Sequence, residues 1–206
     1  MTSAVASKEL PFDNGDVMSR HEFHRLYSQC EDLEHVELIE GVVYLPSPTR
    51  DLEHADQQML VLEWLAAYRG DRPGLVVAPP ASVLLDDRNE PEPDARLYRK
   101  DHARFEDGYL ATPPELIVEI AASSAARDLH QKKRAYERNG VREYIVWRTR
   151  DGAIDWFRLV DGAYVRVEAD KDGIIESEEF PGLRLDVAAM LAHDRQRVLR
   201  ALKPRG

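Results

Sequence analysis

Two carboxylates and a lysine in this sequence are of the types that together act on phosphate esters. Asp94 stands at the start of a short expected strand, and Glu119 lies inside the apolar run 116–121. Lys132 and Lys133 lie on the helix expected just after that run. Two carboxylates on neighbouring strands could hold a hard divalent cation such as Mg²⁺, which prefers oxygen ligands. The cation would activate water, and a lysine would orient that water or stabilise the charge that builds on phosphorus.

The run that contains Glu119 has the length and composition of a buried strand. It follows Pro113-Pro114, is rich in Ile and Val, and ends in small residues. Side chains alternate along a strand, so Ile117, Glu119 and Ala121 project to the same side. A carboxylate on an interior strand costs several kcal/mol unless it is paired or coordinates a metal. We therefore expect a partner to meet Glu119.

The local sequence also permits an interpretation in which these residues have only structural roles. Asp94 could be a turn residue or a cap at a strand start. Glu119 could face solvent on a sheet that is covered on one side. Lys132 and Lys133 could form a solvated helix face, where Asp128 and Lys132 make an ordinary i,i+4 ion pair. Helical geometry does not choose between the two lysines.

Composition places limits on the class of protein. The 206 residues predict one domain, 18–206, behind a loose segment, 1–17. The formal net charge of −10 disfavours non-specific adhesion to nucleic acid or anionic membrane, although a local basic groove or a bound cation could still receive DNA. No apolar run has membrane-spanning length, and the single Cys30 fits a reducing compartment, so we expect a cytoplasmic protein. Cys30 lies beside two acidic residues, which disfavours a thiolate nucleophile.

The order of the expected elements predicts an α/β (or α+β) fold with a mixed β-sheet and added antiparallel hairpins. A capping box predicts a helix from Ser19 to about Cys30, and Glu40-Gly41 is typical of a hairpin turn. The further expected elements are a helix over 51–69, strands at 75–78, 81–85 and 92–97, a loop over 98–112, a helix over 127–139, a strand at 141–147, hairpins turning at 151–152 and 161–162, and a last helix from Asp186 through Leu202.

Several stretches together resemble a known family. The run 119–132 and the run 136–144, which holds Gly-Val-Arg-Glu-Tyr, are similar to the Uma family of putative restriction endonucleases, within the PD-(D/E)XK nuclease-like superfamily. Matching stretches occur in the same order at 36–41, 47–48, His54, 93–94 and 181–185. The resemblance implies a restriction-endonuclease-like core, a mixed β-sheet flanked by helices.

The resemblance also implies a site. Asp94 matches the aspartate of the family's Pro-Asp motif, and Glu119 matches its second acidic residue. The superfamily's usual lysine two residues later is absent, since Ala121 stands there, and Lys132 matches the lysine of the following helix that takes its place. Glu37 and His54 match further recurring positions, where hairpin pairing and helix capping are the simpler roles.

The function that follows is a metal-dependent endonuclease hydrolysing DNA phosphodiester bonds, with catalytic Asp94, Glu119 and Lys132 and with Mg²⁺ or Mn²⁺ on the two carboxylates. The alternatives are an inactive nuclease-like fold that binds nucleic acid or protein, and a hydrolase of smaller phosphate esters. We expect DNA as partner and a homodimer, because one metal site cuts one strand. Three aromatic residues of the hairpins could form the dimer interface or a covered core: Trp156, Phe157 and Tyr164.

Overall fold

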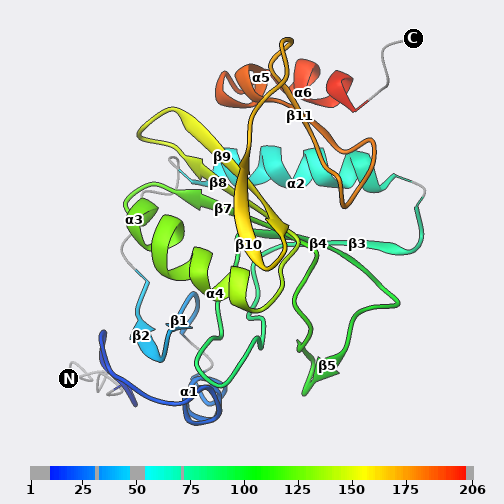
Figure 1. Cartoon of the computed structure of the whole chain (residues 1–206). Helices are drawn as coiled ribbons and strands as arrows, with labels where there is room; N and C mark the ends of the chain where they lie inside the picture. Colours follow the sequence, from blue (N-terminus) through cyan, green and yellow to red (C-terminus); the bar gives the residue numbers. More distant parts are fainter. Residues whose placement is uncertain (1–9, 31–32, 47–53, 71, 203–206) are drawn as a thin grey trace, which may run out of the picture.

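The fold is built on a six-stranded mixed sheet (Figure 1). The computed structural model describes residues 10–30, 33–46, 54–70 and 72–202. Along the sheet the strands run in the order β10-β9-β8-β7-β4-β3, and only β7 and β8 are parallel neighbours. The strands are β3 (Leu75–Ala78), β4 (Ala95–Arg99), β7 (Leu116–Ala121), β8 (Glu143–Arg148), β9 (Ala153–Val160) and β10 (Ala163–Val167). The predicted mixed sheet is confirmed.

Strand β7 is the centre of this sheet, and all six of its residues are buried. Leu116, Val118 and Ile120 belong to the larger hydrophobic cluster on one face. Ile117 and Ala121 belong to a second cluster on the other face. Such a strand needs apolar side chains in both directions, which explains its unbroken apolar run apart from Glu119.

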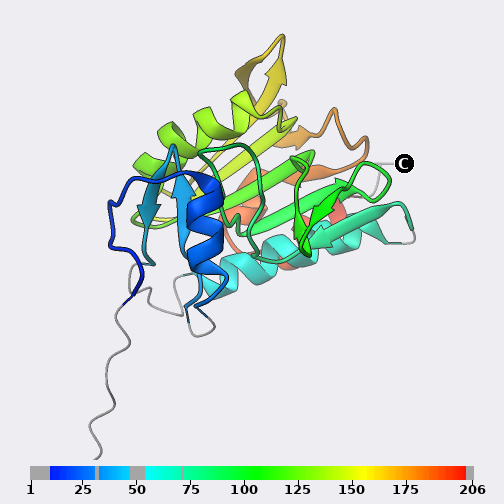
Figure 2. The same ribbon diagram turned by 90° about the horizontal axis from the view of Figure 1, so that it is seen from below.

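Helices cover both faces of the sheet (Figure 2). The helix α2 (Ala55–Arg69) packs with α5 (Val187–Leu191) and α6 (Arg195–Ala201) on the first face. The other face is covered by α3 (Ala125–Arg127), a π-helical turn (Asp128–Lys132) and α4 (Lys133–Arg138), which run on from one another. The helix expected over 127–139 is therefore present, but it contains a π turn.

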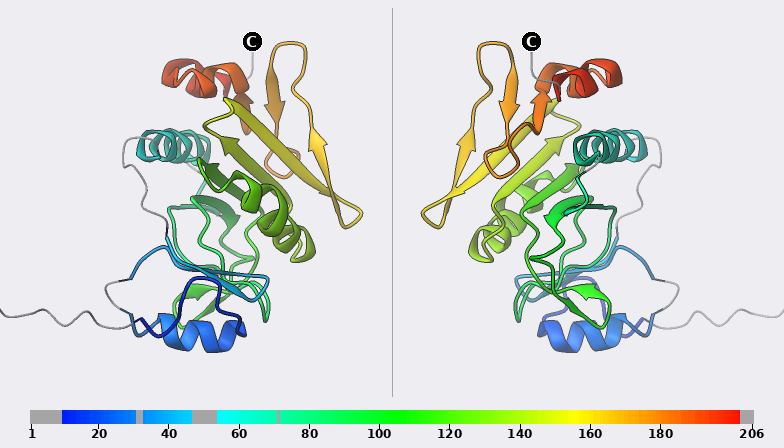
Figure 3. Two further views of the ribbon diagram at one scale, coloured as in Figure 1. Left: turned by 90° about the vertical axis from the view of Figure 1, so that its left-hand side faces the viewer. Right: turned by 90° about the vertical axis from the view of Figure 1, so that its right-hand side faces the viewer.

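The N-terminal elements form a small unit with its own hydrophobic cluster, at the end of the molecule away from α5 and α6 (Figure 3). It contains α1 (Arg20–Tyr27), β1 (Glu37–Ile39) and β2 (Val42–Tyr44). Ser19 caps α1 by accepting a hydrogen bond from the Glu22 N–H, as the capping box predicts. Of the predicted loose segment 1–17, residues 10–17 are described, and there Phe12 is 3% exposed within this cluster. The division into domains stays a prediction.

Three expected elements were wrong in detail. Residues 81–85 form no strand, since only Val83 makes a single bridge, to Leu110. The expected loop 98–112 holds a short hairpin, β5 (Phe105–Glu106) and β6 (Tyr109–Leu110), which turns at Asp107-Gly108. The helix expected from Asp186 to Leu202 is two helices, α5 and α6, because the chain turns at His193 with a φ of 55°.

The C-terminal hairpins are part of the core. Two short strands, β11 (Ile174–Glu176) and β12 (Arg184–Asp186), pair with each other beside α5. Trp156, Phe157 and Tyr164 are 1%, 8% and 9% exposed, so the covered-core reading of these aromatic residues is correct. Among the described residues, no helix combines the length and the apolar character that a membrane crossing requires.

Candidate active site

Two neighbouring strands bring Asp94 and Glu119 together. Strands β4 and β7 pair with Ala95 opposite Val118, so the next position along each strand sets Asp94 opposite Glu119. Asp94 Oδ2 accepts a hydrogen bond of 2.7 Å from the backbone N–H of Ile120. The two acidic residues that the sequence singled out thus lie opposite each other on adjacent strands of the sheet.

Glu119 has the partners that its burial requires. It is 3% exposed, and its Oε1 accepts hydrogen bonds from Lys132 Nζ at 2.8 Å and from Tyr136 Oη at 2.7 Å. None of the hydrogen bonds within the described part of the chain reaches Oε2. The expectation that a partner meets Glu119 is confirmed, and its second carboxylate oxygen has no donor among the described residues.

The structure distinguishes the two lysines of the helix. Lys132 is 3% exposed, and its Nζ lies 2.8 Å from Glu119 Oε1 and 2.6 Å from Glu37 Oε1. We call the group that Asp94, Glu119 and Lys132 form with the side chains that contact them the carboxylate cluster. Lys133 lies outside this cluster, with its Nζ 4.5 Å from the centre of the Phe157 ring. The reading of Lys132 as part of a solvated face is wrong, and Lys132 is the lysine that contacts the carboxylates.

Glu37 and His54 also lie in the cluster. Glu37 Oε1 accepts a 2.9 Å hydrogen bond from the Glu92 N–H besides its contact with Lys132. His54, at the N-cap of α2, places Nε2 3.0 Å from Asp94 Oδ1. Both residues therefore contact a predicted site residue directly, rather than only pairing a hairpin or capping a helix.

Asp128 was missed by the sequence reasoning, which took it for one half of a surface ion pair. It is 2% exposed, and its Oδ1 lies 3.8 Å from Lys132 Nζ. Its Oδ2 accepts a 2.6 Å hydrogen bond from the Ser124 hydroxyl. The spacing of Asp128, Lys132 and Tyr136 at steps of four is the signal that points to one inward helix face. The π turn that carries the first two is a feature often found at functional sites.

The charges of the cluster are unbalanced. Burial raises the pKa of Asp94 to about 7, although the Ile120 N–H and the charge of Lys132 oppose that shift. Burial also raises the pKa of Glu119 well above its ordinary value, and the carboxylates of Asp128 and Asp94 add to this rise. Burial works against the Lys132 ammonium, but Glu119, Glu37 and Asp128 outweigh it and raise the pKa of Lys132, which stays protonated. The single buried ammonium of Lys132 is therefore the counter-charge of several carboxylates. A further cation would lower the repulsion between these carboxylates.

The donor set fits some cations better than others. Within the described ranges, no three or more His, Cys, Asp or Glu side chains are arranged to hold a metal ion. A zinc or calcium site built wholly from protein groups needs at least that number. Mg²⁺ and similar ions are held by one or two carboxylates while water and substrate phosphate fill the other positions. The pair Asp94 and Glu119 is consistent with that kind of site.

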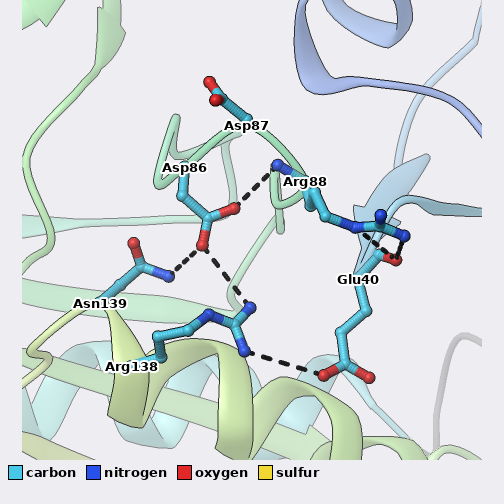
Figure 4. A pocket seen from close by; sticks show the side chains of 6 residues that line it. All are labelled: Glu40, Asp86, Asp87, Arg88, Arg138 and Asn139. Carbon is cyan, nitrogen blue, oxygen red and sulfur yellow. Dashed lines mark hydrogen bonds and ion pairs between the residues drawn. The ribbon is translucent and has the colours of Figure 1, made fainter.

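A separate pocket of about 630 Å³ opens beside the β1–β2 turn (Figure 4). Its basic side chains already have partners, since Arg138 lies 3.6 Å from Asp86 and Arg88 donates to the Glu40 carbonyl at 2.7 Å. The lining residues are Glu40, Asp86, Asp87, Arg88, Arg138 and Asn139, and none of them is a predicted site residue. The pocket is therefore distinct from the carboxylate cluster.

Comparison with known proteins supports the fold and identifies a family. The family Uma2, described as putative restriction endonuclease, matches residues 20–188. A crystal structure of a putative nuclease belonging to DUF820, from Anabaena variabilis, superimposes with a TM-score of 0.63 at 14% identity. The match covers 82% of this chain and 96% of that protein, and at this identity it supports the fold alone. No curated protein matches the sequence.

Proposed function

The chain belongs to the Uma2 family, and from this premise we propose that it is a metal-dependent endonuclease that hydrolyses DNA phosphodiester bonds. The observation that carries the proposal is the meeting of Asp94 and Glu119 on paired strands, with the Lys132 ammonium 2.8 Å from Glu119. Two acids and an amine that are far apart in sequence thereby lie close together, with Glu119 and Lys132 buried and Asp94 partly exposed. DNA as the substrate rests on the nuclease family.

Five residues of the site have a part in the proposed reaction. Asp94 and Glu119 would hold Mg²⁺ or Mn²⁺, which supplies Lewis acidity and an activated water when it is bound. Lys132 is protonated, so it acts as a hydrogen-bond donor that orients water or stabilises negative charge on the phosphoryl group, not as a base. Tyr136 fixes the Glu119 carboxylate through Oε1, and His54 fixes Asp94.

Strand cleavage and metal binding test the proposal together. Wild-type protein is expected to cut plasmid DNA in Mg²⁺ or Mn²⁺, and Asp94→Asn or Glu119→Ala is expected to lose at least 100-fold in rate, on the order of one catalytic group. Mg²⁺ is expected to raise the melting temperature of the wild type and not that of Glu119→Ala. Glu168→Gln, whose side chain is 77% exposed on the far hairpin, is the matched control. Equal cleavage by wild type and Glu119→Ala would refute the assignment.

A binding module without catalysis is the second candidate. The net charge of −10 favours it. The ion pairs of Lys132 with Glu37 and Glu119 also favour it, because they occupy the ammonium that would otherwise contact a phosphate. Binding of duplex DNA without any strand loss in either metal would support it. Hydrolysis of a small phosphodiester, with DNA left intact, would instead point to the third alternative, a hydrolase of smaller phosphate esters.

A further inference from the structure

Arg127 is a partly exposed cation beside the carboxylate cluster. It ends α3, directly before the π turn that carries Asp128 and Lys132. Its side chain is 28% exposed, whereas those of Lys132 and Glu37 are 3% and 8% exposed. Arg127 is thus a cation beside the cluster whose side chain is open in part to solvent, and hence to a substrate.

A chain of charges connects Arg127 to the predicted catalytic residues. Its Nη2 lies 3.7 Å from Glu37 Oε2, and the other oxygen of Glu37 lies 2.6 Å from Lys132 Nζ. Lys132 in turn contacts Glu119. Arg127 is therefore separated from the buried lysine by one carboxylate.

The guanidinium is held in place without using up its donors. Its central carbon lies 4.8 Å from the centre of the Tyr44 ring, a cation–π contact. The Tyr44 hydroxyl donates to Gln131 Oε1 at 3.2 Å, which fixes the ring against the same helix. Among the described residues the buried Nε has no hydrogen-bond partner, and the ion pair with Glu37, at 3.7 Å, is longer than a hydrogen bond. By contrast, Arg134 on the same helix donates to Glu40 Oε2 at 2.8 Å.

We propose that Arg127, stacked on Tyr44, binds a phosphate of the nucleic-acid backbone next to the cleavage site. This inference rests on the proposed function, because it names the contact by which that site receives its substrate. A guanidinium is suited to the task, since its planar fork matches phosphate oxygens and its stacked plane is already oriented. In a chain of net charge −10, a local protein cation beside an acidic cluster favours the approach of the phosphate backbone.

The salt dependence of DNA binding tests the inference. Affinity of the full chain for a 30-base-pair duplex is measured in Ca²⁺ over a range of monovalent salt, with strand integrity checked on a gel. Each phosphate contact contributes about −0.9 to the slope of log K against log salt concentration. Arg127→Gln is expected to bind about five- to tenfold more weakly at 0.1 M salt, with a slope shallower by about 0.9. Arg127→Lys, which keeps the charge, is expected to keep the slope.

Matched variants separate this role from a structural one. Tyr44→Leu removes the ring that holds the guanidinium and is expected to weaken binding. Arg200→Gln, on the distant α6, should leave the slope unchanged. A slope for Arg127→Gln equal to that of wild type, with wild-type cleavage intact, would overturn the inference alone. Failure of the wild type to bind or cut DNA would overturn the proposed function and the inference together.

Discussion

At the scale of single residues, the carboxylate cluster shows how burial around one amine raises the pKa values of acidic side chains. Asp94, Glu119 and Asp128 all have pKa values raised by burial, and Lys132 lowers each of them in part. Such groups are costly in the absence of a cation, because desolvation is only partly offset by pairing. A site that is arranged for binding is therefore expected to be a site of low stability when it is empty.

Asp94 provides a measurable case. Its pKa is about 7 in the folded chain against an ordinary 3.8, so between these values the folded state holds the proton more tightly than the unfolded state. Stability gained from this proton is present below pH 4 and is lost as the pH rises towards 7. In chelator at pH 8, Asp94→Asn is therefore expected to be more stable than wild type by about 1–3 kcal/mol. Urea unfolding at pH 4 and pH 8 measures this, and a variant that is less stable at pH 8 contradicts it.

The two adjacent lysines offer a second comparison. Lys132→Met leaves Glu37 and Glu119 without their buried counter-charge, and a loss of about 3–5 kcal/mol in unfolding free energy is expected at pH 8. DNA cleavage should be lost as well. Lys133→Met removes only a cation–π contact and is expected to cost less than about 1 kcal/mol, with cleavage retained. If both variants behave alike in thermal melts and cleavage assays, Lys132 has no special role.

At the scale of elements, the site depends on the β1–β2 hairpin, which packs beside a helix that is distant from it in the sequence. The β1–β2 turn at Glu40-Gly41 has φ values of 54° and 80°, and it directs Glu37 towards Lys132. The central strand, the hairpin turn and the need for a partner at Glu119 could all be predicted from local composition and spacing. The burial of Asp128 and Lys132 could be predicted only through the helix face that they share with Tyr136, because an i,i+4 acid–lysine pair alone is the same in sequence whether it faces solvent or a docked hairpin.

Turn chemistry explains other differences in the same way. Asp107-Gly108 carries the signal that correctly predicted the turns at 151–152 and 161–162, yet the two-residue strands beside it are too short to show alternation. The break at His193 lies in a helical pattern with no Gly or Pro to announce it. Boundaries of this kind are decided by tertiary packing, which the local pattern does not contain.

Gly41 tests the importance of the hairpin. A Cβ there would lie 2.6 Å from Arg88 Nη2, and the φ of +80° is strained for any other residue. Gly41→Ala is expected to lower the unfolding free energy by about 2–3 kcal/mol: about 1–2 comes from the backbone conformation, and the rest from moving the Arg88 guanidinium off its hydrogen bonds to the Glu40 carbonyl. Gly152→Ala, at a φ of +58° with nothing within 4 Å, is the control and should lose only the backbone contribution. Equal losses in denaturant melts would mean that Arg88 moves aside freely.

At the scale of the whole molecule, the sheet divides its two faces between stability and the proposed chemistry. The face under α2, α5 and α6 holds the larger apolar cluster, while the cluster under α3 and α4 adjoins Glu119, Lys132 and Tyr136. A homodimer would supply the second site that cutting both strands of DNA requires, and it stays a prediction. Any such interface must use surface other than Phe157 and Tyr164, which are covered within the chain.

The aromatic hairpin makes this last point testable. Phe157 is 8% exposed and its ring stacks on Tyr144 with centroids 6.2 Å apart, so Phe157→Ala opens a cavity within one chain. A loss of about 3–5 kcal/mol in unfolding free energy is expected, with the oligomeric state in sedimentation velocity unchanged from that of wild type. Val165→Ala, on the same hairpin with a 53% exposed side chain, should change stability by less than about 0.5 kcal/mol. The contrary result would be a Phe157→Ala protein that is as stable as wild type but monomeric where the wild type is dimeric. That result would place the ring in a dimer interface, because a side chain packed only within its own chain is expected to lower the stability of that chain when it is removed.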